Sequence, residues 1–207
     1  MSALPDIGFI HNYIPATDRS RAPLLLLHGV GGDENALLPF GEKLATGAAI
    51  ISPRGKQREK GAALFFRRLS ETEFDQEDLA FRTRELADFI DSARKLYGLA
   101  KPIAFGFSNG ANIAAALLLT MPQVLAGAVL LRGTAPFEPA TLPDLTGVPI
   151  LMLSGENDPI VKADQRDKLA QMLHAAGADL IHEIYPVGHD LSPRDIEILK
   201  KWHGAHR

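Results

Sequence analysis

Residues 102–121, PIAFGFSNGANIAAALLLTM, decide how the rest of the chain is interpreted. The first six residues are a short apolar run of strand length, and residues 106–110 are a G-x-S-x-G turn. Residues 112–121 are rich in Ala and Leu and end before Pro122, which predicts a buried helix. Strand, sharp turn and helix form the setting in which G-x-S-x-G presents a nucleophilic serine, here Ser108.

Steric crowding explains why this turn has a glycine at each of two positions. The turn is so tight that neighbouring segments pass close by, and side chains at Gly106 and Gly110 would collide with them. A strained backbone at Ser108 lifts its hydroxyl clear of the sheet. Because Ser108 also starts a helix, backbone N–H groups and the helix dipole favour negative charge developing beside it.

The bulk composition excludes several classes of function. The 207 residues are 46% hydrophobic with a net charge of −3, which gives no reason to expect nucleic acid or an anionic membrane as a partner. The chain has no Cys, so disulfides, thiolate metal sites and a cysteine nucleophile are excluded, and a cytoplasmic location is expected. Residues 1–10 lack the features of a signal peptide, and the longest apolar run, residues 111–121, is too short to span a bilayer.

Around the central stretch, apolar runs of strand length alternate with helical patterns. We expect strands at residues 8–14, 23–27, 48–52, 102–107, 126–131, 148–153 and 180–185. We expect helices at residues 35–45, from residue 76 to a C-cap at Gly98, at 112–121, at 163–176, and after Ser192 with Asp195 completing a capping box. Residues 54–75 are the least regular and are expected to form a long loop. The alternation predicts one α/β domain over residues 1–207, with a mostly parallel sheet and helices on both faces.

Four predicted strands end in polar, glycine-rich loops, at residues 28–33, 106–110, 154–159 and 187–190. The C-terminal ends of parallel strands meet at one edge of a sheet. In chain order the loops supply Ser108, Asp158 and His189, the order of a hydrolase triad. A serine hydroxyl needs a base within hydrogen-bond reach, histidine exchanges protons near neutral pH, and an aspartate holds the required tautomer.

An oxyanion hole needs two backbone N–H groups that point at one position. The residue after the nucleophile, Asn109, supplies one, and the amide loop at residues 28–32 supplies the other, which we assign to Val30.

Other residues compete for these roles. Glu156 is a rival acid two residues before Asp158, and an aspartate before a proline also suits a simple turn. We expect His28 to be structural, His182 to pack on its strand, and Asp190 to lie at the surface or at the helix entry. Only the proposed triad combines the right chain order with a position at the end of each strand.

Several motifs carry a family resemblance: LLLLHGVGGDEN (24–35), SPRG (52–55), FFRRL (65–69), DQEDLAFRT (75–83), GFSNGANIAA (106–115), GENDPIV (155–161) and GHDLS (188–192). The chain resembles the phospholipase/carboxylesterase branch of the α/β hydrolases, which includes acyl-protein thioesterases and dienelactone-hydrolase-like esterases. Within that branch it is similar to bacterial carboxylesterases of the methylhydroquinone-induced type. The resemblance covers nearly the whole chain.

The resemblance implies an α/β-hydrolase fold without a large lid, and hydrolysis of small carboxylic esters without a metal or organic cofactor. It supports Ser108, Asp158 and His189 as the triad, with Val30 and Asn109 as the oxyanion amides, and it suggests a homodimer. The chain departs from the family pattern at residues 132–134, Arg-Gly-Thr, where close relatives carry a more His-rich strand end.

The run at residues 65–69 allows two interpretations. In one, Phe66, Arg67 and Arg68 line the substrate pocket, and a guanidinium selects a carboxylate or a polarised carbonyl. In the other, Phe65 and Phe66 pack the loop, and the arginines pair with Glu71, Asp75 or Glu77.

The function predicted from the sequence is that of a cytoplasmic serine esterase with a covalent acyl-enzyme. An alternative within the same chemistry is cleavage of thioesters, or a lysophospholipase-type activity. A protein that kept the fold and lost catalysis is a second alternative, because a fold does not dictate an activity. A metal hydrolase has no support, because no H-x-x-x-H or comparable ligand pattern occurs in the sequence.

Overall fold

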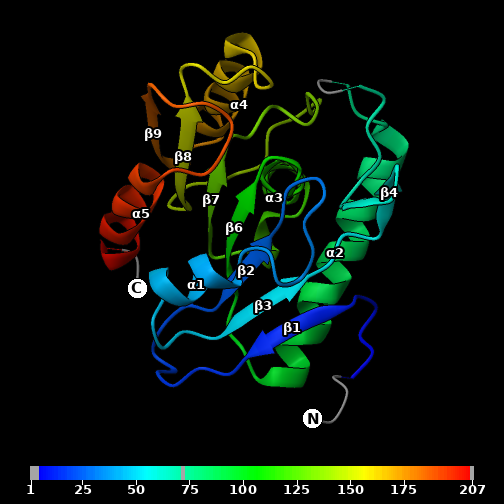
Figure 1. Cartoon of the computed structure of the whole chain (residues 1–207), viewed down its shortest axis with the longest axis vertical. Helices are drawn as coiled ribbons and strands as arrows, with labels where there is room; N and C mark the ends of the chain where they lie inside the picture. The colour runs from blue at the N-terminus through cyan, green and yellow to red at the C-terminus, as the bar shows by residue number, and fades with distance from the viewer. Residues whose placement is uncertain (1–4, 71–72, 206–207) are drawn as a thin grey trace.

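The computed structural model describes residues 5–70 and 73–205. Its centre is a seven-stranded sheet with the order β1-β3-β2-β6-β7-β8-β9 (Figure 1). The edge strand β1 is antiparallel to β3, and the other neighbouring pairs are parallel. The strands are β1 His11–Ile14, β2 Leu24–Leu27, β3 Ile50–Pro53, β6 Ile103–Phe107, β7 Gly127–Leu131, β8 Pro149–Gly155 and β9 Asp179–Tyr185. The predicted α/β fold with a mostly parallel sheet is confirmed.

Helices cover both faces of this sheet (Figure 1). They are α1 Leu38–Leu44, α2 Gln76–Tyr97, α3 Asn109–Thr120, the short 3-10 helix η1 Pro122–Val124, α4 Ala163–Ala175 and α5 Pro193–Ala205. One hydrophobic cluster joins α2, α3 and α4 to one face, and a second joins α1 and α5 to the other.

Strand β2 shows why a continuous apolar run was needed. Leu25 and Leu27 belong to the cluster under α2 and α3, whereas Leu24 and Leu26 belong to the opposite cluster. All four side chains are buried. A strand with helices on both faces cannot alternate apolar and polar residues, so the run of four leucines fits the centre of the sheet.

Helix α2 has the predicted bounds and the predicted glycine at its C-terminal end. Asp75 caps its start by accepting a hydrogen bond from the Asp78 N–H at 3.0 Å. Gly98 ends it in the left-handed conformation, with φ at 65°, a conformation that glycine adopts without steric cost. Among the helices of the described residues, none combines the length and the apolar character that crossing a membrane requires.

Several predicted segments differ from the structure. The strand expected at residues 8–14 begins at His11, and the helix expected at residues 112–121 begins at Asn109. The loop expected at residues 54–75 contains a hairpin of β4 Gln57–Glu59 and β5 Ala62–Leu64. Lys60 and Gly61 form its two-residue turn with φ values of 50° and 89°, the positive values that tight hairpins need. The helix expected from residue 35 begins at Leu38, after a turn in which the Asn35 N–H donates to Asp33.

Candidate active site

Ser108 lies on a sharp turn between β6 and α3. Its φ is 52°, a left-handed value that is strained for a residue with a side chain. Its N–H donates to the Leu131 carbonyl at 2.9 Å, and its carbonyl accepts from Asn112 at 3.0 Å. Neighbouring strand and helix therefore hold the strained backbone and place the side chain at the start of α3.

The glycines on either side of Ser108 are required by close backbone contacts. A Cβ on Gly106 would lie 2.4 Å from the Gly110 carbonyl oxygen, and a Cβ on Gly110 would lie 2.0 Å from the Leu27 carbonyl oxygen. Neither neighbour is a flexible side chain that can move aside. The steric reason inferred from the motif therefore has a specific partner for each glycine.

The structure brings the three predicted triad residues together. The His189 Nε2 lies 3.0 Å from the Ser108 Oγ, and the His189 Nδ1 lies 2.8 Å from the Asp158 Oδ2. The carboxylate only accepts hydrogen bonds, so Nδ1 carries the proton and Nε2 is free to accept from the serine hydroxyl. The Asp158 side chain is fully buried, whereas the His189 side chain is 15% exposed, so the imidazole borders solvent while the acid does not.

Backbone groups fix the Asp158 carboxylate. Its Oδ1 accepts hydrogen bonds from the N–H groups of Ile160 and Val161, each at 2.9 Å. With Oδ2 on His189, both oxygens have donors, which a buried carboxylate needs. The rival acid Glu156 is exposed, and its backbone N–H pairs with the Tyr185 carbonyl at 2.8 Å. The contact with the histidine is thus made by Asp158.

The two other histidines considered from the sequence have structural contacts. His28 accepts a hydrogen bond from the Gly55 N–H at Nε2, at 2.9 Å, and its Nδ1 donates to the Gly29 carbonyl at 2.7 Å. Burial lowers the pKa of His28, so it is held neutral. His182 lies 3.0 Å from the Ser154 hydroxyl, as expected for a residue that packs on its strand.

The two predicted oxyanion amides lie on segments that are hydrogen-bonded to the β4–β5 hairpin or to the residue that follows it. Within the described residues, neither the Val30 nor the Asn109 N–H donates a hydrogen bond to another protein group. Next to Val30, the Gly31 N–H donates to the Ala63 carbonyl at 2.8 Å. The Asn109 side chain accepts from the Phe65 N–H at 2.7 Å. Two unpaired N–H groups are therefore held on segments fixed by β5 and the residue that follows it.

The run at residues 65–69 makes the contacts expected if its phenylalanines pack the loop and its arginines pair with acidic residues. Phe66 is fully buried, with its ring 5.2 Å from that of Phe74. Arg67 pairs with Asp75 at 2.7 Å, one of the expected partners, and Arg68 pairs with Glu59 at 2.7 Å. Glu71, another of the expected partners, lies outside the described residues.

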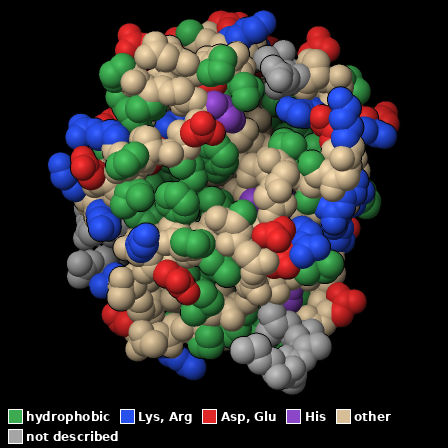
Figure 2. Space-filling view, viewed as in Figure 1, with side chains coloured by type: hydrophobic (Ala, Val, Ile, Leu, Met, Phe, Trp, Pro, Cys, Tyr) green, Lys and Arg blue, Asp and Glu red, His purple; other side chains and the backbone are tan. Residues whose placement is uncertain are grey.

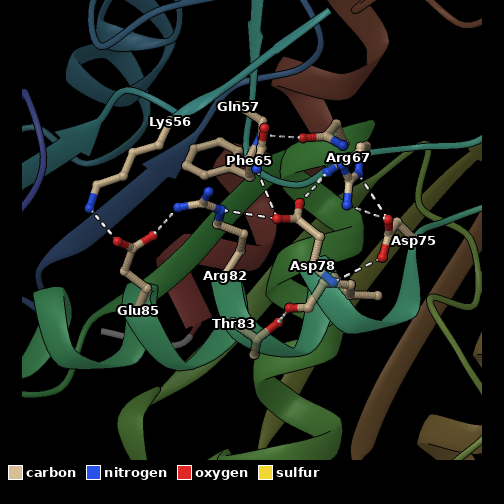
Figure 3. A network of polar contacts seen from close by, with 11 residues as sticks. Lys56, Gln57, Phe65, Arg67, Asp75, Asp78, Arg82, Thr83 and Glu85 are labelled. Atoms are coloured by element: carbon tan, nitrogen blue, oxygen red, sulfur yellow. Dashed lines mark hydrogen bonds and ion pairs between the residues drawn. The ribbon is translucent and has the colours of Figure 1, made fainter.

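A polar network next to this run fixes the hairpin on α2 (Figure 3). The Asp78 carboxylate accepts from the Gln57 side chain at 2.8 Å and from the Arg67 N–H at 2.7 Å. Basic and acidic side chains lie side by side over the region of α2 and β4 (Figure 2). The charges of this region thus pair with one another, which supports the packing interpretation. That Phe66, Arg67 and Arg68 line a substrate pocket stays a prediction.

Arg132 is a residue whose place the sequence did not indicate. It belongs to the segment at residues 132–134 that departs from the family pattern, and its side chain is fully buried in an ion pair with Asp195. Among the described residues, no group of His, Asp and Glu side chains is arranged to hold a metal ion.

Comparison with known proteins places this chain among hydrolases. The profile of the phospholipase/carboxylesterase family matches residues 11–206. The Bacillus subtilis (strain 168) protein MhqD, a proposed hydrolase, is 40% identical over 182 residues, which is 87% of this chain and 91% of that protein. The Bacillus cereus carboxylesterase structure is 39% identical, with a TM-score of 0.94 over 97% of this chain and 95% of that one. A Mesorhizobium loti carboxylesterase structure is 31% identical, with a TM-score of 0.91 over 97% of each chain.

Proposed function

The chain belongs to the phospholipase/carboxylesterase family of hydrolases, and we propose that it is a serine carboxylesterase that uses Ser108, His189 and Asp158. The observation that carries the proposal is the continuous chain of hydrogen bonds from the Ser108 hydroxyl through the His189 ring to the buried Asp158 carboxylate. A serine hydroxyl is a weak nucleophile unless a positioned base takes its proton, and this arrangement supplies that base.

In the first half of the reaction, the Ser108 Oγ attacks the ester carbonyl carbon while its proton moves to the His189 Nε2. The carbonyl oxygen becomes an oxyanion, which the N–H groups of Val30 and Asn109 bind. The tetrahedral intermediate collapses, the carbon–oxygen bond to the alcohol breaks, and His189 returns the proton to the leaving oxygen. The acyl group remains on Ser108 as an ester.

In the second half, His189 removes a proton from a water molecule that attacks this acyl ester. The second tetrahedral intermediate collapses, the bond between the acyl carbon and the Ser108 Oγ breaks, and His189 returns the proton to that oxygen as the carboxylic acid leaves. Asp158 stays ionised throughout and stabilises the imidazolium that forms twice in each cycle. The start of α3 adds its dipole to the stabilisation of both oxyanions.

A fluorophosphonate probe tests the triad, because it reacts with an activated serine. We expect the native chain to be labelled at Ser108 and to hydrolyse short-chain p-nitrophenyl esters. Ser108→Ala should lose both properties while it keeps the thermal stability of the wild type. A folded wild-type chain without labelling or turnover would instead identify a binding protein on a hydrolase fold.

The substrate class that we propose is a small carboxylic ester. Matched oxygen esters and thioesters of the same acyl group, compared by kcat/KM, separate an esterase from a thioesterase. A panel of graded acyl length that includes a lysophospholipid separates short-acyl from lipid substrates. A kcat/KM that rises with acyl length, or that favours the sulfur ester, would overturn the assignment to small carboxylic esters.

A further inference from the structure

A buried guanidinium binds the backbone on both sides of His189. Arg132 follows the last residue of β7, and its Nε donates to the Gly188 carbonyl at 3.0 Å. Its Nη2 donates to the Asp190 carbonyl at 3.1 Å, and its Nη1 donates to the Leu153 carbonyl at the end of β8 at 3.3 Å. Gly188 and Asp190 are the neighbours of His189 in the chain, so one rigid, planar group fixes the peptides that carry the imidazole.

The Asp195 carboxylate holds that guanidinium in place. Its two oxygens accept from Nη1 and Nη2 of Arg132, each at 2.9 Å, and the side chains are 0% and 1% exposed. The same carboxylate accepts from the Ser192 N–H at 2.6 Å and hydroxyl at 2.9 Å, and from the Tyr185 hydroxyl. Asp195 therefore completes the capping box that begins at Ser192, as the sequence indicated. It also neutralises a buried cation, which the sequence did not indicate.

The contacts use the whole hydrogen-bonding capacity of the arginine. A guanidinium has five N–H donors in a fixed plane, and the contacts to Gly188, Asp190, Leu153 and the two Asp195 oxygens use all of them. Arg132 itself has a φ of 55°, a left-handed value that persists only where the surroundings determine it. A lysine has three donors on a flexible stem and cannot reproduce this fork.

We propose that Arg132, held by Asp195, is a positioning residue that sets the orientation of His189 toward Ser108. The proposal rests on the triad proposed above. The guanidinium does not touch the reacting atoms. It acts through the carbonyls of Gly188 and Asp190, and loss of its fork lets the imidazole leave the 3.0 Å contact with the serine hydroxyl.

Arg132→Lys tests the proposal, because lysine keeps the buried positive charge opposite Asp195 and loses the fork to the two carbonyls. We expect kcat for a short-chain p-nitrophenyl ester to fall about 10- to 100-fold, since misplacement of a catalytic group by 1 Å has effects of this order. The rate of fluorophosphonate labelling should fall in parallel, with KM within about twofold of wild type. Arg166→Lys is the matched control, since Arg166 pairs with Asp167 on α4, outside these contacts.

A second variant tests the proposal if the Arg132→Lys protein does not fold. Arg132→Met combined with Asp195→Asn removes both charges, so no unpaired charge remains buried. We expect the same loss of kcat and labelling rate in the folded double variant. Either variant, folded and with wild-type kcat and labelling rate, would overturn the proposal. Failure of both to fold at 25 °C would also overturn it, because the pair would then be needed for folding rather than for positioning.

The experiment separates this inference from the proposed function. If the wild type is not labelled at Ser108, the triad proposal fails. If the wild type is labelled and the Arg132 variants behave like Arg166→Lys, the triad stands and only the positioning role fails.

Discussion

The backbone N–H of Phe65 donates to the Asn109 Oδ1 at 2.7 Å, across 44 positions of the sequence. This bond connects the residue after the β4–β5 hairpin to the residue after Ser108. Asn109 thus has two separate roles. Its side chain holds the hairpin, and its backbone N–H is a proposed oxyanion donor.

Replacement of Asn109 separates these two roles. Asn109→Ala leaves the buried Phe65 N–H without an acceptor, which should lower the free energy of unfolding by about 1–3 kcal/mol. Asn109→Asp keeps an acceptor and should retain most of the stability. However, it should lower kcat, because a negative charge then lies beside the developing oxyanion. Urea unfolding of both variants measures the first effect, and equal stabilities of the alanine and aspartate variants would contradict it.

The contact between Gly110 and the Leu27 carbonyl makes a steric prediction. Gly110→Ala places a methyl group 2.0 Å from a backbone oxygen, so we expect a loss of about 3 kcal/mol, the upper end of the usual cost of overpacking. Gly188→Ala is the control, because the nearest atom to its Cβ would be 4.0 Å away. Thermal unfolding measures both, and a Gly110→Ala protein as stable as Gly188→Ala would show that the turn can relax.

The sequence predicted those parts of the fold whose signals are local. Four consecutive leucines fit a strand only when both faces are covered, and Gly98 is a recognisable helix end. The β4–β5 hairpin was missed because strands of three residues carry too little alternation, and because contacts such as that between Gln57 and Asp78 stabilise it.

The same distinction applies to the site. The proximity of Ser108, Asp158 and His189 was predictable because each lies in a recognisable loop that follows a strand. The ion pair of Arg132 was not predictable, because its partner Asp195 lies 63 positions away, and no local pattern reveals that pairing.

The ion pairs of Arg67 and Arg68 predict little effect on substrate choice. Arg67→Met and Arg68→Met each remove a partly exposed pair, so we expect stability losses of about 0–1 kcal/mol. The ratio of kcat/KM for neutral and anionic esters should change by less than about twofold, because each guanidinium already pairs with a carboxylate of the protein. A selective loss of activity on the anionic ester, measured with a matched neutral ester, would favour the pocket interpretation.

The buried ring of His28 predicts a pH dependence of stability. Burial lowers the pKa of His28 below its usual value of 6.5, so the unfolded chain binds this proton more tightly than the folded protein does. The contribution of His28 is fully present above about pH 6.5 and is lost as the pH falls below that value, with a slope of at most about 1.4 kcal/mol per pH unit.

In a variant without this ring, the free energy of unfolding should decrease less steeply as the pH falls. We expect the free energy of unfolding of His28→Asn, measured in urea between pH 7 and pH 5, to fall less steeply than that of the wild type. The comparison uses slopes, so the lower stability of the variant does not affect it. His174→Asn, at an exposed position of α4, is the control. Identical slopes for wild type and His28→Asn would remove His28 as the cause.

Asp158→Asn and Glu156→Gln decide which acid serves His189. An asparagine at residue 158 keeps the shape but can donate a hydrogen bond to Nδ1, which moves the ring proton to Nε2 and leaves no lone pair to accept from Ser108. We expect kcat to fall about 10⁴-fold, as in serine hydrolases with this change, with nearly unchanged KM. Glu156 is exposed, so Glu156→Gln should keep kcat within about twofold of wild type. If the two variants exchanged these outcomes, the acid would be Glu156, and the hydrogen bond between Asp158 and His189 would not be the one used in catalysis.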